Sequence, residues 1–166
     1  MSEQSFVQQL VQESLPVWEQ CLHSEFLERL ADGTLDVIAT DHAPHAENEK
    51  SKSMLKAPFG IVGLETAAAL TYSELVDKGF LTPLQMAEKM SYQPARVLDI
   101  ERGTLAEGSV ADLVIFDPEA EYAIDAERFE SKGKNTPFHG RKVKGRVAYT
   151  VIAGEIVYSP EDEVSL

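Results

Sequence analysis

Hydrophobic side chains recur at helical spacing through much of the first hundred residues, which predicts a series of helices. Residues 3–15 are expected to be helical, because apolar side chains recur every three or four positions among Gln and Glu. The same spacing predicts helices over 24–31, 62–78 and 82–92. Thr82, which is followed by a proline, is the expected N-cap of the last of these helices.

One apolar run lacks helical spacing. TLDVIAT, residues 34–40, is short, rich in β-branched side chains and nearly all apolar. This composition predicts a strand that is covered on both faces, as in a parallel sheet. A long polar loop, residues 42–60, follows the run. Loops of this length without regular structure are often functional.

The pattern becomes mostly β after Gly103. Residues 111–117 (ADLVIFD) predict one strand, and residues 122–125 (YAID) predict a possible second strand. Residues 145–158 predict a hairpin with its turn at Ala153-Gly154. The chain therefore changes from helices around one apolar strand to a β-rich part.

Composition narrows the class of protein. The chain has 166 residues and a net charge of −13. Its hydrophobic content of 43% is too high for a disordered protein. It is shorter than the roughly 250 residues of a closed (β/α)8 barrel. The acidic balance argues against nucleic acid or an anionic membrane as a partner. A single cysteine excludes an internal disulfide. Because no secretory signal or apolar span is present, a cytoplasmic location is expected.

Charge is segregated within the β-rich part. Residues 117–130 carry six acidic side chains and one Arg, whereas residues 131–154 carry six basic side chains and no acid. We interpret these segments as two solvated faces that attract each other. An anion-binding site is the alternative, although no Gly-rich phosphate loop supports it.

The candidate chemistry lies directly after the predicted strand, in Asp41-His42-Ala43-Pro44-His45. Active sites of parallel α/β folds gather where strands end. A carboxylate there can ligate a metal or move a proton, and an imidazole can ligate a metal or bind an anion. The alternative is that Asp41 caps a turn and that both histidines are ordinary loop residues.

Other polar residues are weaker candidates. His23, between helical segments, is interpreted as structural or exposed. Cys21 is interpreted as a small apolar residue, since it has no basic neighbour in the sequence to lower its pKa. His139 lies in the turn-rich stretch NTPFHG and is expected to fix a loop. Glu65 is expected to lie on a helix surface or to act as a cap.

Five segments carry a family resemblance. They are DGTLDVIATDHAPH (32–45), KAPFGIVGLET (56–66), SYQPARVLDI (91–100), GTLAEGSVADLVIFDP (103–118) and NTPFHGRKVKGRVAYTVIAGEIVY (135–158). Together they resemble the C-terminal part of the dihydroorotases, which are zinc amidohydrolases of pyrimidine biosynthesis. The resemblance covers about residues 32–158, most of the chain.

The resemblance implies an α/β fold in three parts. Residues 32–102 would supply the last strand and the following helices of a (β/α)8 amidohydrolase barrel. Residues 103–166 would supply part of the small β-sandwich beside that barrel. Residues 1–31 match poorly and are expected to form a helical N-terminal segment.

The resemblance also implies residue roles. Asp41 would contact the zinc and act as the general base on a metal-bound hydroxide, then return the proton to the leaving amide nitrogen. His45 would hold the substrate's carboxylate. Phe59 and Gly60 would contact the substrate ring through their backbone, in a turn that Pro58 sets. His42 is assigned no catalytic role.

Most of the family's metal ligands are missing. The resemblance implies an H-x-H pair, a carboxylated lysine and two further histidines from earlier strands, and this sequence has no H-x-H. A catalytic zinc usually needs three protein ligands. We therefore expect a fragment of a dihydroorotase that is inactive alone and holds no zinc stably.

Other functions and partners stay open at this point. The chain is expected to associate with itself or with a missing barrel half, because residues 34–40 are too apolar for an exposed edge. It is alternatively a non-catalytic module that supports a partner such as aspartate carbamoyltransferase. Another cyclic amidase, of the allantoinase or dihydropyrimidinase type, is the third possibility. The expected ligands are dihydroorotate and N-carbamoyl-aspartate.

Overall fold

The structure, a computed structural model, describes residues 25–160. The helix predicted over 3–15, Cys21 and His23 lie outside the described residues. The chain divides into two compact units, Met1–Asp36 and Val37–Leu166. In the first unit residues 25–31 are helical, which confirms the helix predicted there. The boundary expected between residues 102 and 103 stays a prediction.

The predicted helix over 62–78 forms only in its second half. The α-helix α3 (Ala67–Thr71) continues without a break into the π-helical turn η1 (Tyr72–Val76). Residues 61–66 form a bridge and a turn instead of the first helical turns. The reason is that the backbone there pairs with the loop after residue 41, as described below.

The helix predicted from Thr82 is confirmed. It comprises α4 (Pro83–Ala87), the π-helical η2 (Glu88–Tyr92) and α5 (Gln93–Val97). Its first turn is held by a reciprocal capping box, in which the Gln85 N–H donates to Thr82 Oγ1 at 3.2 Å and the Thr82 N–H donates to Gln85 Oε1 at 2.8 Å.

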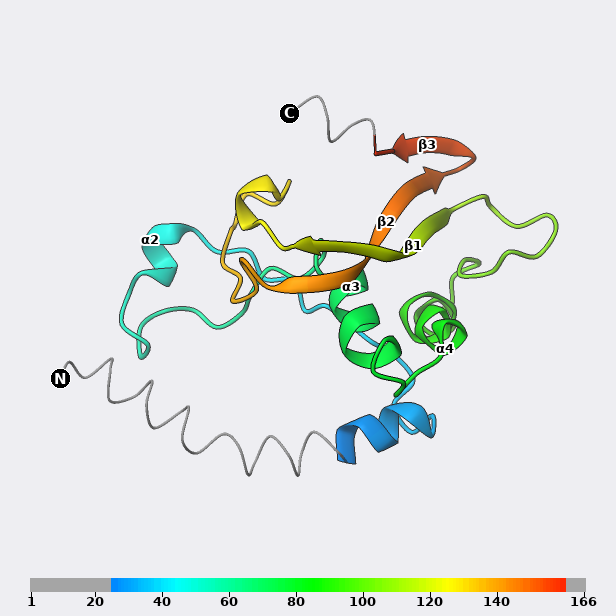
Figure 1. Ribbon diagram of the computed structural model, residues 1–166, viewed down its shortest axis with the longest axis horizontal. Coiled ribbons are helices and arrows are strands. Elements are labelled where there is room, and N and C mark those ends of the chain that lie inside the picture. Colours follow the sequence, from blue (N-terminus) through cyan, green and yellow to red (C-terminus); the bar gives the residue numbers. More distant parts are fainter. Residues whose placement is uncertain (1–24, 161–166) are drawn as a thin grey trace. The chain divides into compact units, whose positions relative to one another are not determined.

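The β-rich part forms a three-stranded antiparallel sheet in the order β1-β2-β3 (Figure 1). Its strands are β1 (Leu113–Ala123), β2 (Lys142–Ile152) and β3 (Glu155–Tyr158). The hairpin turn is confirmed, since Ala153 and Gly154 have φ angles of 51° and 87°, which such two-residue turns require. The two strands predicted over 111–125 are one strand, with an irregular register between Asp117 and Glu121.

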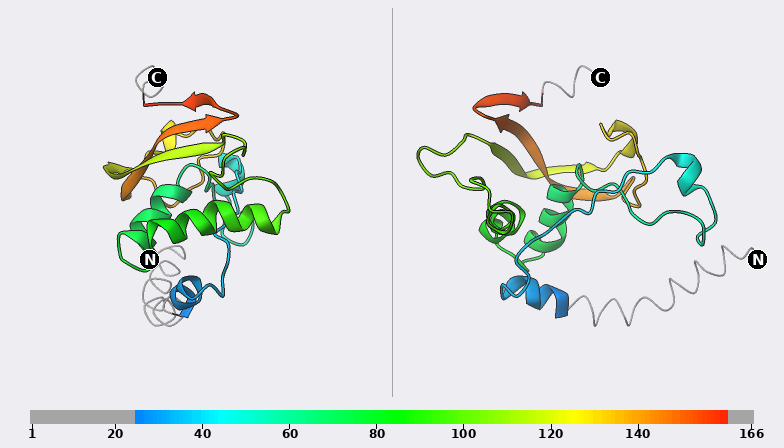
Figure 2. Two further views of the ribbon diagram at one scale, coloured as in Figure 1. Left: turned by 90° about the vertical axis from the view of Figure 1, so that its right-hand side faces the viewer. Right: turned by 180° about the vertical axis from the view of Figure 1, so that it is seen from behind.

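The core of the second unit lies between the sheet and α3, which packs against β2 (Figures 1 and 2). Ala69, Ile124 and Val143 are buried together there. A second contact joins Tyr72 to Phe116, whose ring centroids are 5.3 Å apart. Gly145 makes this contact possible, because a Cβ there would lie 2.4 Å from Phe116 Cζ.

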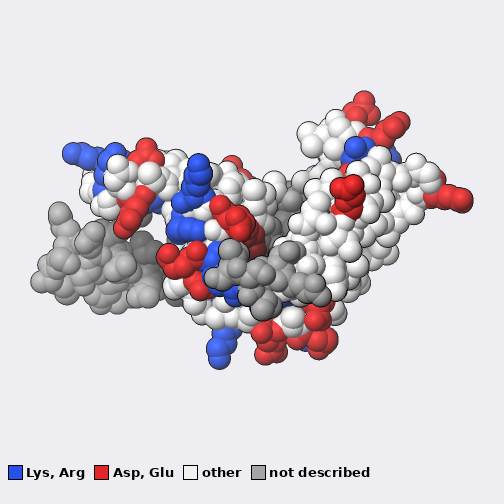
Figure 3. Space-filling model, turned by 90° about the horizontal axis from the view of Figure 1, so that it is seen from above, with Lys and Arg blue, Asp and Glu red and all other residues white. Residues whose placement is uncertain are grey.

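The segregated charges meet across the sheet, which supports the interpretation of two attracting faces. Asp117 is paired with Arg146 in the ladder between β1 and β2. Lys144 Nζ lies 3.7 Å from a Glu119 carboxylate oxygen and 3.2 Å from Asp77 Oδ1. The hydrogen bond to Asp77 is the main cause that raises the pKa of Lys144 above its ordinary value. Figure 3 shows basic and acidic side chains next to one another on the face that it draws.

The strand predicted over 34–40 does not form. Residues 36–40 have no regular secondary structure, although the Ile38 N–H donates to the Lys89 carbonyl at 3.0 Å. A strand needs a hydrogen-bonded neighbour along its length. Among the described residues only one parallel bridge, between His42 and Ile61, follows this segment. The apolar sequence alone therefore does not make it a strand, and its place in a barrel stays a prediction.

Several large hydrophobic side chains of the sheet are exposed, and the most exposed of these include Val114, Ile152, Ile156 and Val157. They fit the expected association with further polypeptide, which stays a prediction. No helix within residues 25–160 is long and apolar enough to cross a membrane.

Candidate functional site

The two ends of the loop that follows residue 40 come together. The parallel bridge between His42 and Ile61 joins them, and the Ala43 N–H donates to the Ile61 carbonyl at 2.8 Å. The short helix α2 (Glu47–Lys50) lies between the two segments in the sequence. All the site residues that the sequence predicts lie on these two segments, at 41–45 and 58–60.

Asp41 is exposed and has an unusual backbone conformation. Its φ angle is +46°, in the left-handed region that non-glycine residues rarely adopt and that Asp and Asn tolerate best. Such a conformation costs roughly 1 kcal/mol, and residues of this kind cluster at functional sites. Within residues 25–160 no group of three or more His, Cys, Asp or Glu side chains is placed to hold a metal ion.

His42 has a positional role. Its Nδ1 accepts two backbone hydrogen bonds, from the Gly63 N–H at 3.1 Å and from the Leu64 N–H at 3.3 Å. Nδ1 therefore carries no proton, and Nε2 is the protonated nitrogen of the neutral ring. These bonds also explain why the helix predicted from residue 62 starts only at Ala67, since the backbone at 63–64 turns toward the site loop.

The His45 side chain is hydrogen-bonded to the second loop segment. Its Nε2 lies 2.8 Å from the Phe59 carbonyl oxygen, so this nitrogen carries the proton that it donates. Its Nδ1 lies 3.9 Å from a Glu49 carboxylate oxygen. A carboxylate ligand that binds to Nε2 must replace the Phe59 carbonyl as the acceptor.

Phe59 and Gly60 form the turn opposite His45. The Phe59 side chain is 96% exposed. Gly60 has a φ angle of +109°, and a Cβ there would lie 2.5 Å from the Ala43 Cβ. Because the peptide bond between them is trans, the Gly60 N–H points away from the Phe59 carbonyl and from His45.

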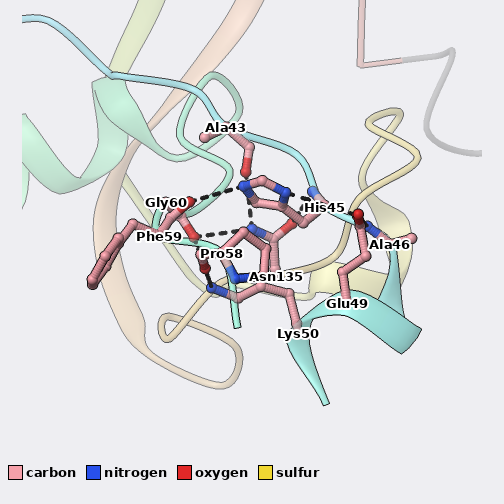
Figure 4. Close-up of polar contacts among 9 residues, drawn as sticks. All are labelled: Ala43, His45, Ala46, Glu49, Lys50, Pro58, Phe59, Gly60 and Asn135. Atoms are coloured by element: carbon pink, nitrogen blue, oxygen red, sulfur yellow. Dashed lines mark hydrogen bonds and ion pairs between the residues drawn. The ribbon is translucent and has the colours of Figure 1, made fainter. Parts of the chain in front are cut away.

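Two residues that the sequence did not single out hold this site together (Figure 4). Lys50 Nζ donates to the Pro58 and Gly60 carbonyls, each at 3.0 Å. Asn135 Nδ2 donates to the Ala43 carbonyl at 3.0 Å and to the Gly60 carbonyl at 3.2 Å. Nothing in the sequence around Lys50 indicates this contact, whereas Asn135 opens one of the segments that carry the family resemblance.

The remaining polar candidates have structural positions. His139 Nδ1 accepts a hydrogen bond from the Ala126 N–H at 3.2 Å, which confirms that it fixes a loop. The Glu65 carboxylate accepts from the Glu130 N–H at 2.8 Å and from the Ser131 N–H at 3.2 Å, so it caps a distant turn. Neither side chain belongs to the cluster around His45.

Comparison with known proteins identifies a family and two groups of relatives. The sequence model of the amidohydrolase family matches residues 23–157. A dihydroorotase from Pelotomaculum thermopropionicum is 56% identical over 130 residues, which are 78% of this chain and 30% of that protein. A dihydroorotase from Clostridioides difficile is 49% identical over 135 residues, 81% of this chain and 32% of that protein.

The solved structures that are similar belong to related enzymes. An L-hydantoinase (dihydropyrimidinase) from Arthrobacter aurescens has a TM-score of 0.77 at 34% identity, covering 81% of this chain and 31% of that one. A D-hydantoinase from a Thermus species has a TM-score of 0.75 at 27% identity, covering 82% and 31%. The chain thus spans about a third of the length of the relatives that it matches.

Proposed function

Because the chain belongs to the amidohydrolase family, we propose that it supplies one part of the active site of a dihydroorotase, with the remainder supplied by further polypeptide. The 56% identity to a dihydroorotase over 130 residues is the observation that carries the proposal. The placement of Asp41, His45 and the Phe59–Gly60 turn supports it, because these residues lie on two loop segments that are hydrogen-bonded to each other.

The proposed reaction is the reversible hydrolysis of L-dihydroorotate to N-carbamoyl-L-aspartate. The oxygen of a water molecule attacks the ring amide carbonyl, a C–O bond forms and the C–N bond breaks. One water proton must reach the leaving nitrogen. We assign this transfer to Asp41, since a positioned carboxylate takes up the proton as a general base and returns it as a general acid.

Zinc, the metal that the family resemblance implies, is proposed to need ligands beyond those of this chain. A catalytic zinc usually has three protein ligands, whereas the described residues place no such group together. We propose that Asp41 contributes one carboxylate ligand and that the other ligands belong to further polypeptide. The isolated chain is accordingly expected to be inactive.

His45 and Gly60 are proposed to bind the substrate. The His45 imidazole would donate to the substrate carboxylate after releasing the Phe59 carbonyl, to which it lies at 2.8 Å here. The Gly60 N–H points away from that carbonyl and would donate to a carbonyl of the substrate ring. Lys50, which donates to the Pro58 and Gly60 carbonyls, would keep the turn in this orientation.

A chimera tests the proposal. Residues 25–158 replace the matching region of the Pelotomaculum thermopropionicum dihydroorotase, and hydrolysis of L-dihydroorotate is followed spectroscopically. We expect turnover by the chimera and none by the chain alone.

Asp41→Asn should lower kcat by a factor of about 10³ or more, in the range that catalytic carboxylates contribute. Asn suits a positive φ angle, so this substitution removes the charge without adding backbone strain.

The control is Asp36→Asn, which makes the same chemical change at an exposed residue before the site. It should leave kcat within about twofold. A chimera that folds, binds zinc and has no turnover would refute the assignment and favour a non-catalytic module. Equal losses in both variants would refute the role of Asp41.

The similarity to hydantoinase structures favours a second candidate, another cyclic amidase. The two candidates differ in the substrate, because dihydroorotate carries a carboxylate and dihydrouracil does not. If His45 binds that carboxylate, His45→Ala should raise KM about tenfold for dihydroorotate and leave KM for dihydrouracil unchanged. Preferred turnover of dihydrouracil by the chimera would favour the second candidate.

A further inference from the structure

One side chain from the C-terminal part of the chain contacts both loops of the candidate site. Asn135 lies between β1 and β2 in the sequence, about ninety residues after His45. Its Oδ1 accepts from the His45 N–H at 3.0 Å, while its Nδ2 donates to the Ala43 carbonyl at 3.0 Å and to the Gly60 carbonyl at 3.2 Å. Figure 4 shows the amide between these groups.

The backbone of Asn135 adds a fourth bond. The Val62 N–H donates to the Asn135 carbonyl oxygen at 3.1 Å. The side-chain amide uses both of its polar atoms, and the backbone ties the same residue to the second loop. Asn135 is therefore hydrogen-bonded to the backbone of both 43–45 and 60–62.

The space around this amide is tightly defined. Gly133, two residues earlier, lies so close to the first loop that a Cβ there would be 2.8 Å from the Pro44 Cβ and 2.9 Å from Asn135 Oδ1. The backbone at 133–135 therefore contacts the loop directly. A longer or shorter side chain at position 135 would not reach the same three backbone groups.

We propose that Asn135 is a positioning residue that sets the separation between His45 and the Phe59–Gly60 turn, and so the size of the cyclic amide that both can contact. The inference rests on the proposed function, because the two loops are there assigned to the substrate. Asn135 itself does not contact the substrate. Asn135 fixes the carbonyl of Gly60. Through the backbone of Gly60, it thereby restricts the direction of the Gly60 N–H.

The Phe59–Gly60 turn depends on this residue for a physical reason. Gly60 has a φ angle of +109° and no side chain that would restrict it, so its conformation is set by what its carbonyl binds. That carbonyl accepts from Lys50 Nζ at 3.0 Å and from Asn135 Nδ2 at 3.2 Å. Because the same side-chain amide also accepts from the His45 N–H at 3.0 Å, Asn135 links the Gly60 carbonyl directly to the His45 backbone.

Amide hydrogen exchange on the full chain tests the first step. Asn135→Ala removes every side-chain bond, whereas Asn135→Asp keeps an acceptor for the His45 N–H and removes both donors. In Asn135→Ala the amides of Ala43, His45 and Val62 should exchange about tenfold faster, the order of effect of a lost hydrogen bond. In Asn135→Asp the His45 amide should stay protected while those of Ala43 and Val62 exchange faster.

Asn48→Asp is the matched control, since Asn48 is exposed in α2 and the change is chemically identical. It should leave all three amides within about twofold. Faster exchange of the His45 amide alone in Asn135→Ala would overturn the proposal, because the two loops would then be independent. Equal effects of the control would overturn it as well.

Kinetics of the dihydroorotase chimera test the second step. A positioning role predicts that Asn135→Ala raises KM for L-dihydroorotate about tenfold and leaves kcat within about threefold, because the loops contact the substrate and Asp41 moves the proton. Simple loss of folded protein would lower the apparent kcat with KM unchanged, and that result would overturn the proposal. If the unsubstituted chimera shows no turnover, the proposed function fails, and the exchange experiment still decides whether Asn135 couples the loops.

Discussion

The sheet with its helix α3 and the candidate site are held together in different ways. In the sheet, β1 and β2 pair along most of their length and bury Ile124 and Val143 against Ala69. In the site, the backbone of residues 41–45 makes one bridge, and most of the other contacts run from side chains to backbone carbonyls or N–H groups. The first arrangement depends on apolar burial, and the second on a few polar side chains.

The comparison shows how a pair of loops keeps its shape with little apolar burial. Apolar burial needs a large contiguous surface, and residues 41–62 lie on loops that cannot provide one. A polar side chain that donates to two carbonyls fixes two segments with little buried area. The segments at 41–45 and 58–60 are therefore organised by polar contacts within residues 25–160.

The largest effect is expected in the sheet, from Ile124→Ala. Ile124 is 2% exposed in the apolar cluster, so the substitution should lower the free energy of unfolding by about 3 kcal/mol. Urea denaturation measures this change. Ile156→Ala is the matched control, because Ile156 is 64% exposed, and it should cost about 0.5 kcal/mol. Similar losses in the two variants would mean that this cluster is not the stabilising core.

A smaller effect is expected in the site, from Gly60→Ala. The new Cβ would lie 2.5 Å from the Ala43 Cβ, at a φ angle of +109°, and should cost about 2 kcal/mol of local stability. Faster exchange of the Ala43 amide, with the urea midpoint nearly unchanged, is the expected result. Gly79→Ala has a similar φ angle of +78° with no atom within 4 Å of the new Cβ, and so reports the backbone strain alone.

The two regions also differ in how well the sequence predicts them. The helix at Thr82 and the hairpin at Ala153-Gly154 follow from local signals, a capping residue and a turn residue, and both are confirmed. The strand predicted over 34–40 does not form, because a strand needs hydrogen-bonded neighbours and local composition cannot supply them.

In the site, the sequence places the candidate residues on the right loops but does not find what holds them. Asp41, His45 and Gly60 were identified by their resemblance to a family motif, and their roles stay predictions. Lys50 and Asn135 were missed, because the contacts of Lys50 depend on how the loop to Gly60 folds back and those of Asn135 on a segment about ninety residues away. No spacing in the sequence predicts a bond between residues about ninety positions apart.

Substituting His42 is expected to have a smaller effect on local stability than substituting Gly60. In His42→Ala the N–H groups of Gly63 and Leu64 lose their acceptor, which should cost about 1 kcal/mol and speed their exchange. His42→Asn should restore part of the protection, because the Asn Oδ1 lies near the position of the imidazole Nδ1. If the two variants exchange alike, the imidazole acceptor does not hold this turn.

The smallest effect is expected from a charged contact between the helix and the end of the sheet. The Glu74 carboxylate accepts hydrogen bonds from Lys78 and from Arg141, and the bond from Lys78 is the main cause that lowers the pKa of Glu74 below its ordinary value of 4.5. The unfolded chain therefore binds this proton more tightly than the folded chain does. The carboxylate stabilises the fold above pH 4.5, and this contribution is lost as the pH falls through the lowered pKa.

Partial exposure limits this contribution to a few tenths of a kcal/mol. The measurement is the difference in the free energy of unfolding between the unchanged chain and Glu74→Gln, from pH 3 to 7. The difference should be largest near neutral pH and vanish at the acidic end, where both side chains are uncharged. A difference independent of pH would show that Glu74 acts by packing, as the apolar residues of the sheet do, and not by its charge.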